Sequence, residues 1–294
     1  MMTLNGLLSR HTHIIADGAW GTELARLGLG VGEIPETWNT LRPDAVAGIG
    51  MEYVKAGAQI ILTNTFGGNR LKLAKAGLED AASSLTQSGA ALSRLGAGHE
   101  ALVMGSIGPT GEFMRPLGLV SEQEMIACFA QQVTALVAGG VDGFVIETMS
   151  DLAEARAALE AVHDNSSLPA VVSMTFEPGP RGAATIMGVK PEQAAEELAA
   201  AGAQVIGANC GSGPESMVEV IAQMAQVSSL PLWAKPNAGL PELIQGKTVF
   251  RKTPEEMAAD LPALLDAGAR IVGGCCGTTP AHIRAMARAL RNGG

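Results

Sequence analysis

Short apolar runs and amphipathic stretches alternate along the whole chain. Four times, a helical stretch ends in alanine and glycine and leads directly into an apolar run, which reads IILTN, GFVIET, VIGANC or IVGGCC. Glycine at a helix C-terminus followed by a buried strand is a common connection between a helix and a strand. Because these runs are continuously apolar rather than alternating, they indicate parallel strands that are covered on both faces.

The pattern predicts eight strands, at 13–17, 60–64, 102–107, 143–147, 170–176, 205–209, 231–235 and 271–274. Helices are predicted at 43–56, 121–138, 151–162, 191–201, 214–227 and 254–267, and a last helix begins at Pro280. Eight strand–helix units of about 35 residues predict an α/β fold, a single (β/α)8 TIM barrel that forms one domain over residues 1–294. A doubly wound sheet is the alternative. However, the glycine-rich segment DGAWGT (17–22) lacks the GxGxxG spacing of a dinucleotide-binding turn.

Composition and charge exclude several classes of protein. Of the 294 residues 47% are apolar, which is enough for a large core, and few are aromatic, with Phe 6, Trp 3 and Tyr 1. The formal net charge of −9 argues against nucleic acid or an anionic membrane surface as a partner. The sequence shows no targeting or membrane-spanning segment, and four cysteines do not suggest a disulfide framework, so we expect a cytoplasmic protein.

Three cysteines fall at the ends of predicted strands, where barrel enzymes carry their chemistry. Cys210 follows strand six, and Cys275 and Cys276 follow strand eight. Because these strands flank strand seven, we expect the three sulfurs to converge and to suit Zn²⁺, with a fourth position open to substrate or water. The alternatives are buried hydrophobic cysteines or a redox disulfide between the adjacent pair, which lacks the CxxC spacing. Cys128, inside a predicted helix, is expected in the core.

Other polar residues also end predicted strands. Asp17 and Glu147 end strands one and four, where a carboxylate can bind an ammonium group or take part in a structural ion pair. Asn64 and Asn237 are candidate polar anchors of the rim or turn residues. The glycine-rich segment 105–112 can close over a substrate or serve as an ordinary loop. No histidine ends a predicted strand, which argues against histidine ligands and a histidine base.

Seven segments at successive strand ends resemble the homocysteine S-methyltransferase family. They are DGAWGTEL (17–24), ILTNTFGGNR (61–70), GSIGPTGE (105–112), VDGFVIETMSD (141–151), IGANCGSGPE (206–215), KPNAGLPE (235–242) and GGCCGTTPAH (273–282). This family includes betaine–homocysteine methyltransferases, S-methylmethionine-dependent enzymes and the homocysteine-binding module of cobalamin-dependent methionine synthase. The resemblance extends over nearly the whole chain.

The resemblance implies a barrel in which Cys210, Cys275 and Cys276 hold zinc. Homocysteine then binds the metal as a thiolate and attacks an activated methyl group, giving methionine. The thiolate is the nucleophile, and zinc binding deprotonates a thiol that is mostly protonated at pH 7. No catalytic residue is expected beyond this zinc-activated substrate thiolate.

The resemblance also implies where the amino-acid part of homocysteine binds. The family's binding region matches Asp17 with the backbone that follows it, and Glu147. We assign Glu147 to the substrate ammonium group. We assign the backbone from Gly18 through Ala19 to Thr22 to the substrate carboxylate.

The resemblance leaves the methyl donor open. The sequence stops at Gly294, without the folate and corrinoid domains of methionine synthase, so we expect either a small donor or a methyl-corrinoid on a separate protein. Trp38 matches a tryptophan of the betaine enzymes, which ranks betaine or a related onium compound first. A tyrosine of some betaine enzymes is replaced by Gly67. A corrinoid protein ranks second and S-methylmethionine third, because GGCCGTTP lacks the arginine common in enzymes that use S-methylmethionine.

Two other classes stay open at this point. One is a non-catalytic subunit that binds zinc or homocysteine for a partner, which turnover by the isolated chain would exclude. The other is a thiol-redox protein, which would contain a disulfide and no metal.

Overall fold

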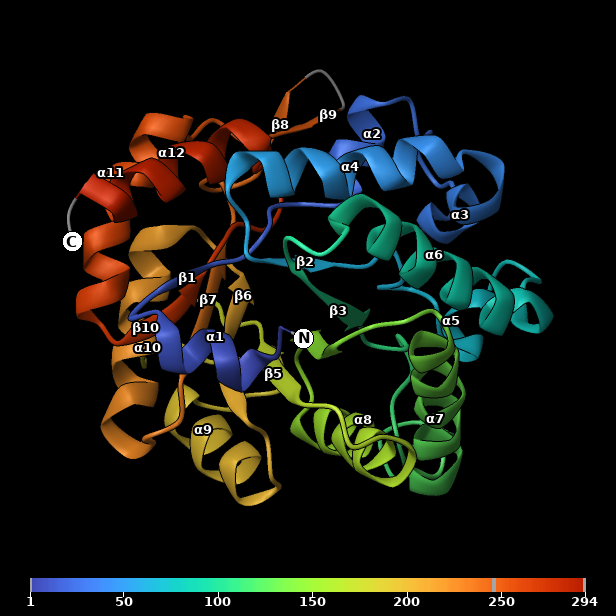
Figure 1. Cartoon of the computed structure of the whole chain (residues 1–294). Helices are drawn as coiled ribbons and strands as arrows, with labels where there is room; N and C mark the ends of the chain where they lie inside the picture. The colour runs from blue at the N-terminus through green and yellow to red at the C-terminus, as the bar shows by residue number, and fades with distance from the viewer. Residues whose placement is uncertain (1, 245–246, 293–294) are drawn as a thin grey trace.

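Eight parallel strands form a barrel that is surrounded by helices in the computed structural model, which describes residues 2–244 and 247–292 (Figure 1). The strands follow the order β1-β10-β7-β6-β5-β4-β3-β2, and a parallel bridge between Ala16 and Ile60 joins β1 to β2. This circular order confirms the (β/α)8 barrel and excludes the doubly wound sheet. Among the described residues, no helix is long and apolar enough to span a membrane.

The barrel strands are β1 (Ile14–Ile15), β2 (Ile60–Leu62), β3 (Leu102–Ile107), β4 (Gly143–Met149), β5 (Ala170–Met174), β6 (Val205–Cys210), β7 (Leu232–Pro236) and β10 (Ala269–Val272). The longer helices are α4 (Pro43–Ala56), α6 (Ala82–Ala97), α7 (Glu122–Ala138), α8 (Leu152–Asn165), α9 (Pro191–Ala200), α10 (Pro214–Val227), α11 (Pro254–Asp266) and α12 (Pro280–Asn292). The shorter ones are α1 (Leu4–Arg10), α2 (Gly21–Arg26), α3 (Trp38–Leu41) and α5 (Arg70–Ala74), with 3-10 turns η1 (Pro35–Thr37) and η2 (Glu79–Ala81).

Two apolar cores stabilise the barrel. One lies between the strands and the outer helices, and the other fills the barrel interior. Leu4 and Leu7 of α1 pack into the interior core beside Ile60 and Val205, which begin their strands. Helix α1 therefore closes the N-terminal end of the barrel, in front of the strands in Figure 1, and leaves the C-terminal end for the site.

The structure adds the short helices α1, α2, α3 and α5 to the predicted elements, and it differs from the prediction in other places as well. Helix α6 was not predicted, because its buried face consists mainly of small residues such as Gly89 and Ala90, which give a weak helical pattern. A hairpin of β8 (Glu242–Ile244) and β9 (Lys247–Val249) lies between β7 and α11. Because β8 is exposed throughout, its sequence has no apolar pattern that would predict a strand. Strand β4 continues beyond the predicted end at 147, through a register shift between Ile146 and Met149.

Candidate functional site

Three thiols meet at the C-terminal end of the barrel. Cys210 ends β6, and Cys275 and Cys276 follow β10, so the sulfurs approach from both sides of β7. Their sulfur atoms all lie within 4.8 Å of one another, and the Cys210 and Cys275 sulfurs are 3.0 Å apart. All three cysteines are free. The predicted convergence is confirmed, whereas Cys128 is buried in α7, as expected for a core residue.

The backbone around the thiols is held in place by β7 and by tight packing. The Cys275 amide donates to the carbonyl of Pro236 at 2.8 Å, and the Ala238 amide donates to the carbonyl of Cys276 at 2.9 Å. A Cβ atom at Gly274 would lie only 2.4 Å from Oγ1 of Thr278, so this position requires glycine. Glycine at this position therefore allows the chain to pass close to Thr278 directly before the two adjacent cysteines.

The three cysteine sulfurs are suitable ligands for a soft divalent cation. Hydrogen bonds that the Cys276 sulfur accepts from Cys210 and Cys275 lower its pKa to about 3, while the same shared bonds raise the pKa of Cys210. The three sulfurs therefore share protons among themselves in a half-buried place, and a bound cation would favour their deprotonated forms. Thiolate sulfur is the ligand that Zn²⁺ prefers in such sites. Among the described residues, no other His, Cys, Asp or Glu side chain groups with the three sulfurs, so a bound metal would keep a position for a substrate.

A cavity of about 380 Å³ opens in front of the three sulfurs. Its wall includes Gly18, Ala19, Trp20, Thr22, Glu36, Asn64, Phe66, Lys72, Ser106, Glu147, Thr148 and Lys235. Its size is in the range of pockets that bind small molecules. The cavity therefore places the thiols, the Glu147 carboxylate and the backbone after Asp17 around one space.

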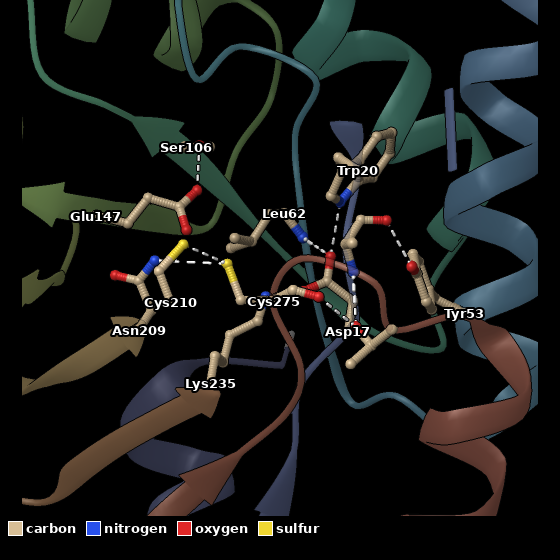
Figure 2. A network of polar contacts seen from close by, with 12 residues as sticks. Asp17, Trp20, Tyr53, Leu62, Ser106, Glu147, Asn209, Cys210, Lys235 and Cys275 are labelled. Carbon is tan, nitrogen blue, oxygen red and sulfur yellow. Dashed lines mark hydrogen bonds and ion pairs between the residues drawn. The ribbon is translucent and has the colours of Figure 1, made fainter. Parts of the chain in front are cut away.

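Glu147 points toward the sulfurs from β4 (Figure 2). Its carboxylate accepts a hydrogen bond from Ser106 Oγ at 2.5 Å, and the residue is 8% exposed. Burial raises the pKa of Glu147 to about 7, against the opposing effect of the Lys235 charge. A buried carboxylate that lines a cavity is well suited to bind a substrate cation, which would stabilise its charged form.

Asp17 faces a buried lysine rather than the cavity. Its Oδ1 accepts from Lys235 Nζ at 2.5 Å, and its Oδ2 accepts from Trp20 Nε1 at 2.8 Å and from the Leu62 amide at 2.7 Å (Figure 2). The Asp17 side chain has no exposed surface. The carboxylate is therefore fully used inside the protein, which matches the ion-pair alternative and not direct ammonium binding.

Sequence reasoning assigned no role to Lys235, which is buried and lines the cavity. Burial alone would lower its pKa, but the negative charges of Asp17 and Glu147 raise it above the usual value. The ammonium group is therefore charged and compensates both carboxylates. A signal was present in the sequence, because a lysine in the apolar strand LPLWAKP must have a charged partner when buried.

The backbone that follows Asp17 is fixed from two sides. Tyr53 of α4 donates its hydroxyl proton to the Ala19 carbonyl at 2.6 Å, and the Ala19 amide donates to Thr278 Oγ1 at 3.1 Å. A Cβ atom at Gly18 would lie 2.7 Å from the Tyr53 hydroxyl. This segment is therefore rigid, and Gly18, Ala19 and Thr22 all line the cavity.

The structure does not bring every predicted site residue to the cavity. Asn64 lines it, with its amide donating to the Pro35 carbonyl at 2.8 Å. Asn237 does not line it and instead donates to the Gly211 carbonyl at 2.6 Å, beside Cys210. Trp38 does not line it either. It begins the short helix α3 and packs in the outer core.

Two other aromatic residues, Trp20 and Phe66, line the cavity. The sequence analysis did not assign either of them to binding of the methyl donor. The Lys72 ammonium nitrogen lies 4.5 Å from the centre of the Phe66 ring. Burial lowers the pKa of Lys72, against the opposing charge of Glu36. The Phe66 ring therefore already has a cationic neighbour, which would compete with an onium methyl donor.

Comparison with known proteins connects this geometry to a family. A model of the homocysteine S-methyltransferase family matches residues 14–290. The chain belongs to the homocysteine S-methyltransferase family. Methionine synthase from Mycobacterium tuberculosis is 31% identical over 297 residues, covering 95% of this chain, and that from Mycobacterium leprae is 32% identical over 295 residues, covering 94%. The alignments cover 25% and 24% of those two proteins, so the chain spans about a quarter of the length of these relatives.

A solved structure of the same family has the same fold along its whole length. The homocysteine methyltransferase MmuM from Escherichia coli, in its metallated form, is 25% identical with a TM-score of 0.82. The match covers 97% of this chain and 99% of MmuM. An oxidized form of MmuM also matches, with a TM-score of 0.80. The family match and the shared barrel therefore agree on the fold and the family of this chain.

Proposed function

We propose that this protein is a zinc-dependent homocysteine S-methyltransferase that produces methionine. One observation supports the proposal above all. The three convergent thiols and the buried Glu147 carboxylate line the same cavity. An amino acid with a thiol on its side chain can therefore meet a sulfur-rich metal site and a carboxylate at once. The metallated form of the related MmuM supports a metal in this place.

Zinc, when bound by Cys210, Cys275 and Cys276, supplies the positive charge that keeps a substrate thiol deprotonated near pH 7. Glu147 accepts hydrogen bonds from the substrate ammonium group, and Ser106 holds its carboxylate in place. The rigid backbone after Asp17 receives the substrate carboxylate. The substrate sulfur would then lie beside the half-buried cysteines, at the cavity where the methyl donor must approach.

We propose a methyl-corrinoid on a separate protein as the donor, ahead of betaine. Trp38, the residue that favoured betaine, does not line the cavity, and Lys72 lies beside the Phe66 ring. Without Trp38, an onium donor would lack a complete aromatic cage, since Trp20 and Phe66 are the aromatic residues of the described lining and Phe66 already has a lysine beside its ring. The similarity to methionine synthases over about a quarter of their length supports the same choice.

Turnover with defined donors tests both the function and the donor. Zinc-loaded protein is incubated with homocysteine and with methylcobalamin, glycine betaine or S-methylmethionine, and methionine is measured by mass spectrometry. We expect methionine from methylcobalamin alone. Equal amounts of methionine and dimethylglycine in the betaine sample would instead establish a betaine-dependent enzyme. Lack of turnover with every donor would favour the non-catalytic subunit.

A change at Glu147 tests the assignment of the substrate ammonium group. Glu147→Gln retains the size of the side chain and an oxygen that can accept from Ser106, but removes the negative charge. We expect the homocysteine KM to rise about 10- to 100-fold, the usual effect of losing a hydrogen bond between charged groups. Zinc content should stay near one per chain by atomic absorption. Loss of the metal in this variant would show instead that Glu147 supports the zinc site.

A further inference from the structure

The side-chain amide of Asn209 uses all of its hydrogen-bonding positions. Asn209 precedes Cys210 in β6 and is buried. Its Oδ1 accepts from the Thr148 amide at 2.8 Å and from Ser173 Oγ at 2.7 Å. Its Nδ2 donates to Thr148 Oγ1 at 2.7 Å. The same nitrogen contacts the Cys275 sulfur at 3.8 Å (Figure 2). An asparagine amide offers two acceptor and two donor positions, so this one is locked in a single orientation.

The partner of Asn209 in β4 has a strained backbone. Thr148 has a φ of 60°, in the left-handed region that β-branched residues strongly disfavour. It follows Glu147 within the register shift of β4, and such bulges commonly redirect a side chain beside an active site. Two hydrogen bonds join Thr148 to Asn209, one donated by the Thr148 amide and one donated by Asn209 Nδ2. They connect β6 to the part of β4 that directly follows Glu147.

We propose that Asn209 is a positioning residue that fixes the spacing between the Glu147 carboxylate and the Cys275 sulfur, and thereby selects the length of the substrate thiol. This inference rests on the proposed function, in which Glu147 binds the ammonium group and Cys275 holds the metal. A substrate bound at both points must span the space between them. Cysteine is shorter than homocysteine by one methylene group, so a fixed spacing rejects it and a relaxed spacing admits it.

Thiol binding to the cobalt-substituted protein tests the inference without a methyl donor. Co²⁺ replaces zinc, and the sulfur-to-cobalt charge-transfer band is titrated with homocysteine and with cysteine. We expect the wild-type protein to prefer homocysteine by about tenfold or more, within the range that one methylene group contributes in a specific pocket. In Asn209→Ala, the ratio of the two dissociation constants should fall toward about one, with homocysteine binding weakened more than cysteine binding.

Three further variants separate the contacts of the amide. Asn209→Asp retains the Oδ1 acceptor but loses the N–H group that faces Cys275, so we expect metal affinity in a chelator competition to fall about tenfold or more. In Thr148→Gly, the glycine adopts the left-handed backbone without strain, so this variant should fold readily. Because it lacks the Oγ1 contact with Asn209, its preference for homocysteine over cysteine should also fall. Ser173→Ala is the matched control, because it removes one hydrogen bond to Asn209 and should retain the preference.

The outcomes distinguish this inference from the function on which it rests. Failure of the wild-type cobalt protein to bind homocysteine would overturn the proposed function, and the inference with it. If the wild-type protein prefers homocysteine and both Asn209→Ala and Thr148→Gly retain that preference, the inference alone is overturned. An equal loss of preference in Ser173→Ala would overturn it too, because any buried polar deletion would then have the same effect.

Discussion

Replacement of Cys276 by alanine is expected to abolish metal binding and methyl transfer together. The three sulfurs lie within 4.8 Å of one another, and no other metal-ligating side chain among the described residues joins them. Two remaining thiolates are too few for a stable zinc site. We expect the zinc content to fall from about one per chain to a small fraction. We expect kcat/KM to fall more than about 100-fold, because loss of a metal ligand costs more than the usual 10- to 100-fold loss when a residue that hydrogen-bonds to a ligand is changed.

Zinc content by atomic absorption and methionine formation are measured on the same samples. Cys128→Ala is the matched control, because Cys128 is fully buried in α7, away from the cluster, and should retain both zinc and activity. It should lose only about 1 kcal/mol of stability, as is typical of a small core truncation. Full activity in a zinc-free Cys210→Ala, Cys276→Ala double variant would contradict the proposed mechanism.

Replacement of Lys235 by methionine is expected to destabilise the fold strongly. The lysine side chain is 3% exposed, and its ammonium group lies 2.5 Å from Asp17, which has no exposed surface. Removing one member of a buried ion pair leaves the other charge without compensation, at a typical cost of about 3–5 kcal/mol. The Glu147 carboxylate would lose a nearby positive charge as well, since Lys235 lowers its pKa. Urea unfolding of the zinc-loaded proteins measures the change in unfolding free energy.

A second substitution distinguishes loss of the ion pair from loss of packing. Asp17→Asn retains an oxygen that can accept from Trp20 and Leu62, as the carboxylate does. We expect the Lys235→Met, Asp17→Asn double variant to be more stable than the sum of the single effects predicts, by about 1–3 kcal/mol. Strict additivity of the two substitutions would show that no charge compensation exists between these side chains.

Much of the site could be predicted from the chain because a parallel barrel brings its strand ends together. Cys210 and Cys275 are separated by 65 residues, yet both follow strands that flank β7, and their sulfurs meet. The last helix also begins at Pro280, as predicted. These predictions needed only the strand pattern and the rule for the active end of a barrel.

The direction in which individual side chains point was less predictable. Trp38 was predicted to lie at the rim, but it packs in the outer core. Asp17 ends a strand beside the cavity, but its carboxylate turns to Lys235. The rotation of a short helix or a single side-chain torsion angle sets the direction of each of these two side chains. Such choices depend on neighbours that are distant in sequence.

The sequence by itself determined the barrel, the family and the three thiols, because each follows from local pattern and from residue types that suit one chemistry. Only the tertiary structure decided which charges compensate one another, since Lys235 and Asp17 are separated by 218 residues. It also decided that Asn209 connects the strained Thr148 to the Cys275 sulfur. A hydrogen bond of this kind needs atoms placed to within a few tenths of an ångström. Packing of the complete barrel sets that placement, and no local sequence pattern encodes it.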